Sequence, residues 1–143
     1  MPDAIPPINA PAPVRVLVAD DSSAVVTGIR RFLAARRGVA VVAAAVDGHD
    51  AIEKCRQHQP DIVVMDVHMP ALDGLKAAAS LRREFPAIRI ILISVDQGEQ
   101  LRADSLKHGA DAFLPKIGLQ HNLMNEIRRL FPHVPGSTPP FGP

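Results

Sequence analysis

Five short apolar runs divide the middle of the chain, and each is followed by a longer segment that mixes apolar and polar residues. The runs occupy residues 16–19, 39–43, 62–65, 90–93 and 112–114. They do not alternate with polar residues, so both faces of each strand are expected to be buried, as in a parallel sheet covered by helices. The pattern predicts five strand–helix repeats in a single, doubly wound α/β domain.

The segments between the runs carry apolar residues with helical spacing. In the last segment, Leu123, Ile127 and Leu130 lie four and three positions apart, which places them on one helix face. Gly38 and Gly109 stand where two helices are expected to end, because glycine readily adopts the left-handed conformation that closes a helix. Functional groups in such a fold gather beyond the carboxyl ends of the strands, so reactive side chains are expected at that edge.

Polar residues follow four of the five predicted strands. Asp20 and Asp21 follow the first strand, Asp66 the third, Ser94 the fourth and Lys116 the fifth. Because these strand ends share one edge, the five side chains are expected to meet in one pocket. Three neighbouring carboxylates repel one another, and a divalent cation relieves that repulsion. Their hard oxygen atoms suit Mg²⁺, which readily bridges a carboxylate and a phosphate.

The same pocket combines groups that suit phosphoryl transfer to a carboxylate. Lys116 supplies a compact positive charge and Ser94 a hydroxyl donor. A metal ion and a lysine neutralise charge on the oxygens of a phosphoryl group, which leaves little covalent chemistry for the protein. A carboxylate nucleophile then yields an aspartyl phosphate.

The pocket residues belong to a longer ordered set of motifs. The set comprises Asp20-Asp21, Met65-Asp66, Met69-Pro70, Asp73-Gly74, Ser94 and the stretch from 109 to 116. It resembles the receiver domains of bacterial two-component response regulators over residues 14–131. Gly28 and residues 113–116 make the chain most similar to receivers that usually precede a helix-turn-helix output domain. The resemblance implies a flavodoxin-like fold of five parallel strands in the order 2-1-3-4-5 with five helices.

The resemblance also assigns the acidic residues. It implies that Asp66 accepts the phosphoryl group. It implies that Mg²⁺ is held by Asp20, Asp21, Asp66 and the backbone carbonyl of His68. Taken alone, Asp20 and Asp21 would be compatible with a simple turn and cap before a helix. A function as a phosphoaccepting switch, and not as an enzyme that turns over a substrate, follows from the resemblance.

Three further residues are assigned to the switch by the same resemblance. Lys116 would pair first with Asp66 and then with the phosphate. Ser94 would bond to the phosphoryl group after switching, and Phe113 would be the aromatic residue whose rotamer reports the change. The phosphodonor would be a sensor histidine kinase or a histidine phosphotransfer protein. The responding surface, at residues 97–131, would meet a downstream protein or a second copy of the chain.

The sequence departs from the family pattern at three positions. Val95 follows Ser94, where the family usually has a small residue, and a branched side chain there could narrow access to the phosphoryl group. Ile117 follows Lys116, where proline is common, so the loop conformation stays open. The reporting aromatic residue is Phe113, which lacks the hydroxyl group of tyrosine.

Two other functions stay open at this stage. His68 follows Asp66 as in the aspartate-any-histidine motif of cobalamin-binding domains, although that motif wants glycine where Ala71 stands. A small metal-dependent phosphatase of the haloacid dehalogenase type would need its nucleophile after the first strand and an aspartate at the position of His68.

Composition and charge limit the partners and the compartment that the sequence suggests. The formal net charge is +1, which gives no field that would attract nucleic acid. Four Arg-Arg pairs, at 30–31, 36–37, 82–83 and 128–129, are expected on solvated helix faces. The single cysteine, Cys55, excludes an internal disulfide and is expected in the core. No apolar run is long enough to insert in a membrane and no secretory signal starts the chain, which favours the cytoplasm.

Prolines mark both edges of the predicted domain. Five of the 14 prolines lie in residues 1–13 and five in residues 132–143, so these segments are expected to be disordered tails. The receiver domain is expected to span residues 14–131. Because only the proline-rich segment follows the last helix, a stand-alone receiver without an output domain is expected.

Overall fold

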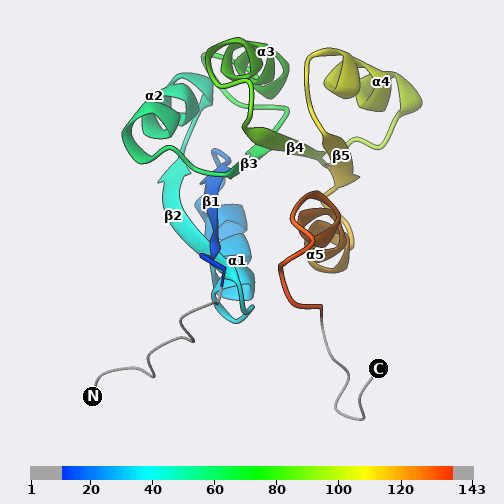
Figure 1. The fold of residues 1–143 in the computed structure, drawn as a ribbon. Coiled ribbons are helices and arrows are strands. Elements are labelled where there is room, and N and C mark those ends of the chain that lie inside the picture. The colour runs from blue at the N-terminus through cyan, green and yellow to red at the C-terminus, as the bar shows by residue number, and fades with distance from the viewer. Residues whose placement is uncertain (1–10, 137–143) are drawn as a thin grey trace.

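Strands and helices alternate strictly along the computed structural model of the protein, which describes residues 11–136 (Figure 1). The strands are β1 (Val14–Ala19), β2 (Val39–Ala45), β3 (Ile62–Asp66), β4 (Arg89–Ser94) and β5 (Ala112–Pro115). The helices are α1 (Ser23–Ala34), α2 (Gly48–His58), α3 (Gly74–Glu84), α4 (Glu99–Lys107) and α5 (Leu119–Leu130). These elements confirm the strand–helix repeats that the apolar runs predict.

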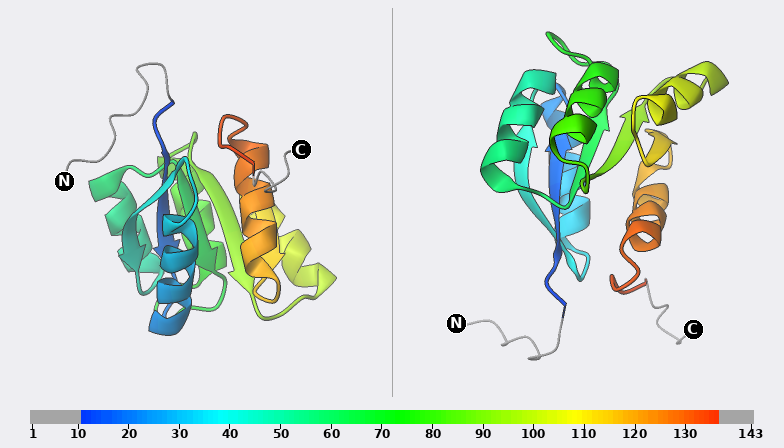
Figure 2. Two further views of the ribbon diagram at one scale, coloured as in Figure 1. Left: turned by 90° about the horizontal axis from the view of Figure 1, so that it is seen from below. Right: turned by 45° about the horizontal axis from the view of Figure 1, so that its top comes forward.

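The five strands form one parallel sheet in the order β2-β1-β3-β4-β5. Helices α2, α3 and α4 cover one face, and α1 and α5 cover the other (Figures 1 and 2). The strand order changes direction at β1, which lies between β2 and β3. The crevice beyond the carboxyl ends of β1 and β3 is therefore the expected site of function. The predicted fold and strand order are confirmed.

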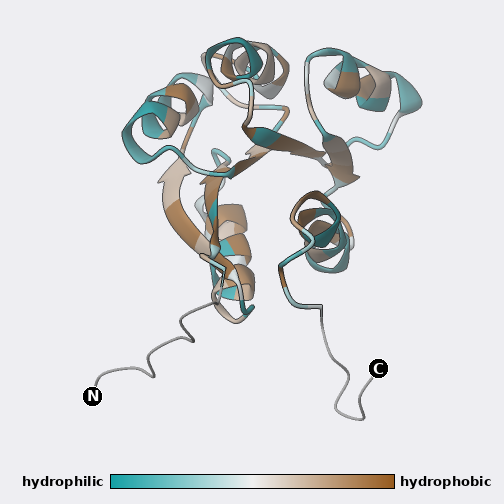
Figure 3. Ribbon diagram, viewed as in Figure 1, coloured by the Kyte–Doolittle hydropathy of each residue, from teal (hydrophilic) through white to brown (hydrophobic). Residues whose placement is uncertain are grey.

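Each face of the sheet has its own apolar core. Leu17, Met65 and Leu92 belong to the cluster under α2–α4, whereas Val64 and Ile91 belong to the cluster under α1 and α5. Neighbouring residues of a strand point to opposite faces, so an unbroken apolar run fills both clusters at once. The strands are accordingly mostly apolar, with polar residues near their ends (Figure 3).

Cys55 lies fully buried in the cluster under α2–α4. Burial raises the pKa of its thiol from 9.0 to about 12, with a smaller contribution from the charge of Glu84. The reactive thiolate form is therefore scarce at neutral pH. We expect a thiol reagent to react with the native protein at a rate limited by unfolding; fast reaction without denaturant would contradict this burial.

The folded part continues beyond the predicted boundary at residue 131. Val134 is 3% exposed in the cluster under α5, and its N–H donates to the carbonyl of Phe131 at 3.0 Å. One valine among prolines has no periodicity, so the sequence pattern could not place it. In the tail expected at 132–143, Val134 is therefore packed while residues 132, 133, 135 and 136 are exposed. The tail residues 1–10 and 137–143 lie outside the described part.

Arg82 is half-buried, although the Arg-Arg pair 82–83 was expected on a solvated helix face. Its guanidinium donates five hydrogen bonds, to the carbonyls of Pro86, Ile88 and Gly109 and to the carboxylate of Asp111. These bonds join the end of α3 to the segments that enter β4 and β5. Across residues 11–136 no helix is long and apolar enough to cross a membrane.

Candidate functional site: an acidic pocket at the carboxyl edge of the sheet

Three aspartates meet where β1 and β3 end. Asp66 is the last residue of β3, and Asp20 and Asp21 directly follow β1. One carboxylate oxygen from each lies within 4.8 Å of the other two. Asp20 and Asp66 are buried, whereas Asp21 is exposed to solvent. The structure thus brings together the carboxylates that their strand-end positions predict to be neighbours.

Lys116 closes the pocket from the end of β5. Its ammonium donates a hydrogen bond to Asp66 Oδ2 at 2.9 Å and lies 2.9 Å from Asp20 Oδ2. Burial lowers the pKa of Lys116, but the two carboxylates outweigh this effect, so the pKa lies above its ordinary value. Lys116 is therefore charged at neutral pH and offsets part of the repulsion between Asp20 and Asp66.

The oxygen atoms of the pocket fit a divalent cation. Asp20 Oδ1 accepts the N–H of Ser22 at 2.9 Å. Buried Asp20 Oδ2 accepts no aligned hydrogen bond within residues 11–136 and meets the charge of Lys116, 2.9 Å away. A buried carboxylate oxygen without a donor is costly unless a charge meets it. Asp21 offers a second oxygen from the solvent side. This set of hard oxygens matches the ligands that Mg²⁺ prefers.

Two helix starts hold the pocket loops in place. The Ser22 side chain accepts the N–H of Val25 at 3.3 Å and caps α1, and Asp73 caps α3 by accepting the N–H of Lys76 at 2.9 Å. At Gly74 a β-carbon would lie 2.3 Å from the carbonyl oxygen of Asp66. Glycine at 74 therefore allows α3 to begin directly behind Asp66, a requirement that the sequence pattern did not reveal.

Ser94 lies fully buried at the end of β4. Its Oγ accepts the N–H of Asp96 at 3.0 Å, and Asp96 Oδ2 lies 2.8 Å from His68 Nε2. The N–H of His68 in turn donates to Asp66 Oδ1 at 3.0 Å. The loops after β3 and β4 are thus joined beside Asp66. The contact of His68 with Asp96 could not be predicted from the sequence, because the two residues lie far apart in the chain.

Three apolar residues lie near the pocket. Phe113 is only 5% exposed and packs in the cluster under α2–α4. Val95 is 70% exposed, so its side chain faces solvent, and its effect on access to Asp66 stays a prediction. Ile117 is also exposed, at 72%. The pocket is therefore flanked by two exposed branched side chains.

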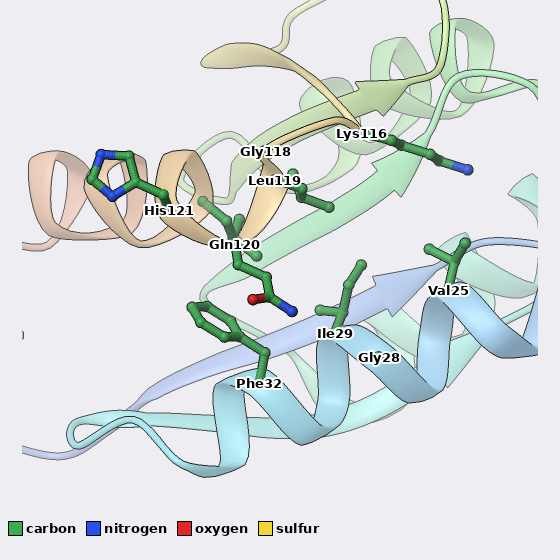
Figure 4. A pocket seen from close by; sticks show the side chains of 10 residues that line it. Val25, Gly28, Ile29, Phe32, Lys116, Gly118, Leu119, Gln120 and His121 are labelled. Atoms are coloured by element: carbon green, nitrogen blue, oxygen red, sulfur yellow. The ribbon is translucent and has the colours of Figure 1, made fainter.

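An apolar groove of about 520 Å³ opens beside the acidic pocket, between α1 and α5 (Figure 4). Val25, Ile29 and Phe32 line it from α1, and Leu119 and Leu123 line it from α5. A β-carbon at Gly28 would meet no atom within 4 Å, so glycine leaves the middle of the groove open. Lys116 lies at one end, which makes the groove continuous with the acidic pocket.

Comparison with known proteins identifies one family. The sequence model described as "Response regulator receiver domain" matches residues 16–128. The response regulator GacA of Pseudomonas viridiflava is 36% identical over 118 residues, which cover 82% of this chain and 55% of GacA. The chain thus spans about half the length of this relative.

Two solved structures extend the similarity to three dimensions. The signal receiver domain of the putative response regulator NarL from Mycobacterium tuberculosis is 33% identical, with a TM-score of 0.79, over 83% of this chain and 96% of that one. The second structure is a complex from Borrelia burgdorferi that contains CheX, CheY, BeF₃ and Mg²⁺. One chain of this complex is 30% identical to the protein, with a TM-score of 0.78, over 84% of this chain and 90% of that one.

Proposed function

The chain belongs to the response regulator receiver family, and we propose that it accepts a phosphoryl group on Asp66 in a Mg²⁺-dependent reaction. The observation that carries the proposal is the position of the Asp66 carboxylate. One oxygen is bound by Lys116, the other by the backbone N–H of His68, and two more carboxylates lie beside it. The phosphodonor is a sensor histidine kinase or a histidine phosphotransfer protein, the partners of receiver domains in two-component systems.

The residues of the pocket support a direct transfer. An oxygen of Asp66 forms the new O–P bond while the N–P bond of the donor phosphohistidine breaks, and the imidazole nitrogen keeps the electron pair. Lys116 lies close enough to exchange its contact with Asp66 for a phosphoryl oxygen. A bound Mg²⁺ would neutralise the phosphoryl oxygens. Asp20, Asp21, Asp66 and the backbone carbonyl of His68 are the groups proposed to hold it.

The apolar groove between α1 and α5 is the surface proposed to receive the phosphodonor. It opens at Lys116, so a helix packed against Val25, Ile29 and Leu119 would bring a histidine on its side toward Asp66. Helices dock in apolar grooves through side chains spaced by three and four positions. The exposed Ile117 adds apolar surface at the rim.

Three measurements separate this function from the alternatives. A phosphoacceptor takes up phosphate from acetyl phosphate and stops near one per chain. A phosphatase instead releases phosphate from an ester such as p-nitrophenyl phosphate for many turnovers. A cobalamin carrier using His68 shows corrinoid absorbance after purification or reconstitution. Sustained turnover or bound corrinoid, without labelling, would reject the proposed function.

The first prediction concerns the metal ion. Mg²⁺ binds the folded pocket and relieves carboxylate repulsion, so it is expected to raise the free energy of unfolding by about 2.7 kcal/mol at a hundred times its dissociation constant. Asp21→Ala removes an exposed oxygen of the acidic cluster and should abolish most of the response. Thermal melts with Mg²⁺ and with EDTA measure it, and Glu99→Ala is the matched control. A full Mg²⁺ response in Asp21→Ala would exclude Asp21 as a ligand.

The second prediction concerns Ser94. A phosphoryl group carries about −1.5 to −2 charges and can draw the Ser94 hydroxyl from the N–H of Asp96. One hydrogen bond to a charged group is worth about 1.5–3 kcal/mol, which shifts a two-state loop roughly ten- to a hundredfold. Ser94→Ala is expected to accept phosphate yet lose phosphate-dependent partner binding or dimer formation at residues 97–131.

The readout for Ser94 is sedimentation or partner binding with and without acetyl phosphate, together with amide chemical shifts. Ser80→Ala, a half-buried serine on α3, is the control. Shifts in the wild-type protein should concentrate in residues 94–116 and in α5. If phosphate drives association in Ser94→Ala as strongly as in the wild type, Ser94 does not couple the site to that surface.

A further inference from the structure

A second hollow lies at the far end of α1 from the acidic pocket. It has a volume of about 370 Å³ and is lined by Ala35, Arg36, Arg37, Met124, Arg128, Pro135 and Gly136. Helix α1 begins at Ser23, next to the acidic residues, and ends at Ala34, next to this hollow. The two sites are therefore separated by the whole length of the helix, and the hollow has no part in the proposed phosphoryl transfer.

The hollow exists because two segments close on each other. Val134 is buried against α5, which seats residues 134–136 beside the turn between α1 and β2. Gly38 in that turn has a φ of +82°, and a β-carbon there would lie 2.9 Å from Cδ of Pro135. The backbone at Gly136 passes against the stem of Arg128. Arg36 and Arg37 are thereby brought together with Arg128, which is far from them in the sequence.

The three arginines of the hollow have no acidic partner among the residues that the structure describes. Within residues 11–136, Arg56, Arg82, Arg89 and Arg129 form salt bridges, whereas Arg36, Arg37 and Arg128 form none.

Two of these three arginines are nevertheless held in place. The guanidinium of Arg36 lies 4.2 Å above the ring of Phe32, and Arg128 donates to Asn125 at 3.0 Å. Each of these contacts leaves further N–H donors unused, because a guanidinium carries five. Positive charge thus gathers in a concave site of a protein whose net charge is only +1.

This geometry matches a phosphate group on a small molecule. A guanidinium can donate two parallel hydrogen bonds to two oxygens of one phosphate. Three guanidinium groups offer more donors than the two oxygens of a carboxylate can accept, which favours a phosphate over a carboxylate. A volume of about 370 Å³ is in the range of small-ligand sites. The buried side chain of Met124, with Ala35 and Pro135, adds an apolar wall for the organic part of the ligand. We propose that this hollow binds a small phosphomonoester such as a nucleoside monophosphate.

The test uses the full chain with Asp66→Asn, so that phosphoryl transfer at the acidic pocket cannot contribute. Adenosine monophosphate, inorganic phosphate and adenosine are titrated separately in EDTA at low salt, and amide shifts and heats of binding are recorded. Adenosine monophosphate is expected to saturate and to shift residues 35–38, 124–128 and 134–136. Inorganic phosphate should bind more weakly at the same residues, and adenosine should not bind.

Arg37→Gln and Arg128→Gln should each weaken adenosine monophosphate binding roughly tenfold, the loss of one charge-assisted contact. Arg102→Gln, on exposed α4, is the control and should bind like the parent. Circular dichroism checks that each variant folds. The proposal is overturned if adenosine monophosphate does not saturate, if its shifts fall elsewhere, or if Arg102→Gln weakens binding equally.

Discussion

Asp66→Asn is expected to abolish phosphorylation of the protein while leaving it folded. The amide of asparagine has no anionic oxygen that can attack phosphorus, so the loss should be complete and not partial. The amide oxygen can still accept the N–H of His68, which Asp66 Oδ1 accepts at 3.0 Å. Removing one of two buried charges beside each other also reduces repulsion with Asp20. The amide nitrogen then replaces the oxygen that Lys116 binds, and the loss of this contact opposes the gain from reduced repulsion. Stability in EDTA should therefore stay close to that of the wild type.

The measurement is incorporation of phosphate from acetyl phosphate with Mg²⁺, followed by mass spectrometry. Asp104→Asn is the matched control, because Asp104 lies on α4 away from the pocket and its contact with Gln100 can be kept by asparagine. The control should label like the wild type. Wild-type labelling of Asp66→Asn would reject Asp66 as the acceptor, whereas loss of its circular dichroism signal would contradict the tolerance expected from the structure.

Lys116→Met is expected to cost about 3 kcal/mol of stability in the absence of divalent cations. The substitution keeps most of the unbranched side chain but removes the ammonium that two buried carboxylates share. This is the lower end of the range for breaking a buried ion pair, because Lys116 is 18% exposed. The folded pKa of Lys116 lies above 10.5, so its stabilisation is present at neutral pH and is lost only as pH rises through the folded pKa.

Urea unfolding in EDTA and in Mg²⁺ tests the role of Lys116. Mg²⁺ should add more stability to Lys116→Met than to the wild type, because in the variant the negative charges of Asp20 and Asp66 are not offset by Lys116. Lys107→Met, on the exposed last turn of α4, is the control and should change little. A Lys116→Met protein as stable as the wild type in EDTA would show that Lys116 does not offset the charge of Asp20 and Asp66.

The apolar runs predicted the sheet because nearly every residue in them is buried on one face or the other. The pocket followed from topology, since parallel strands end at one edge and Asp20, Asp66 and Lys116 each stand at such an end. The strand assignments alone therefore place these three side chains in one pocket. The Asp-Asp, Ser and Lys residues occur in the same order along the chain as in the receiver family. This order pointed to phosphoryl transfer as the chemistry of the pocket.

Features that depend on residues meeting across loops could not be predicted in this way. The contact of His68 with Asp96 joins two loops, and the network of Arg82 joins α3 to two strands. Neither has a periodic signal in the sequence. The close approach at Gly74 depends on a helix start lying against Asp66, which only the fold reveals. Val134 was missed because a single apolar residue among prolines gives no pattern.

The most direct test of the account is to count and locate the phosphoryl groups on the wild-type protein. The protein is incubated with acetyl phosphate and Mg²⁺, its intact mass is followed over time, and the acyl phosphate is trapped by borohydride reduction before peptide mapping. The account predicts that uptake stops at one phosphoryl group per chain and that the modified residue is Asp66. Modification of another residue, or no uptake at all by the folded protein, would contradict it.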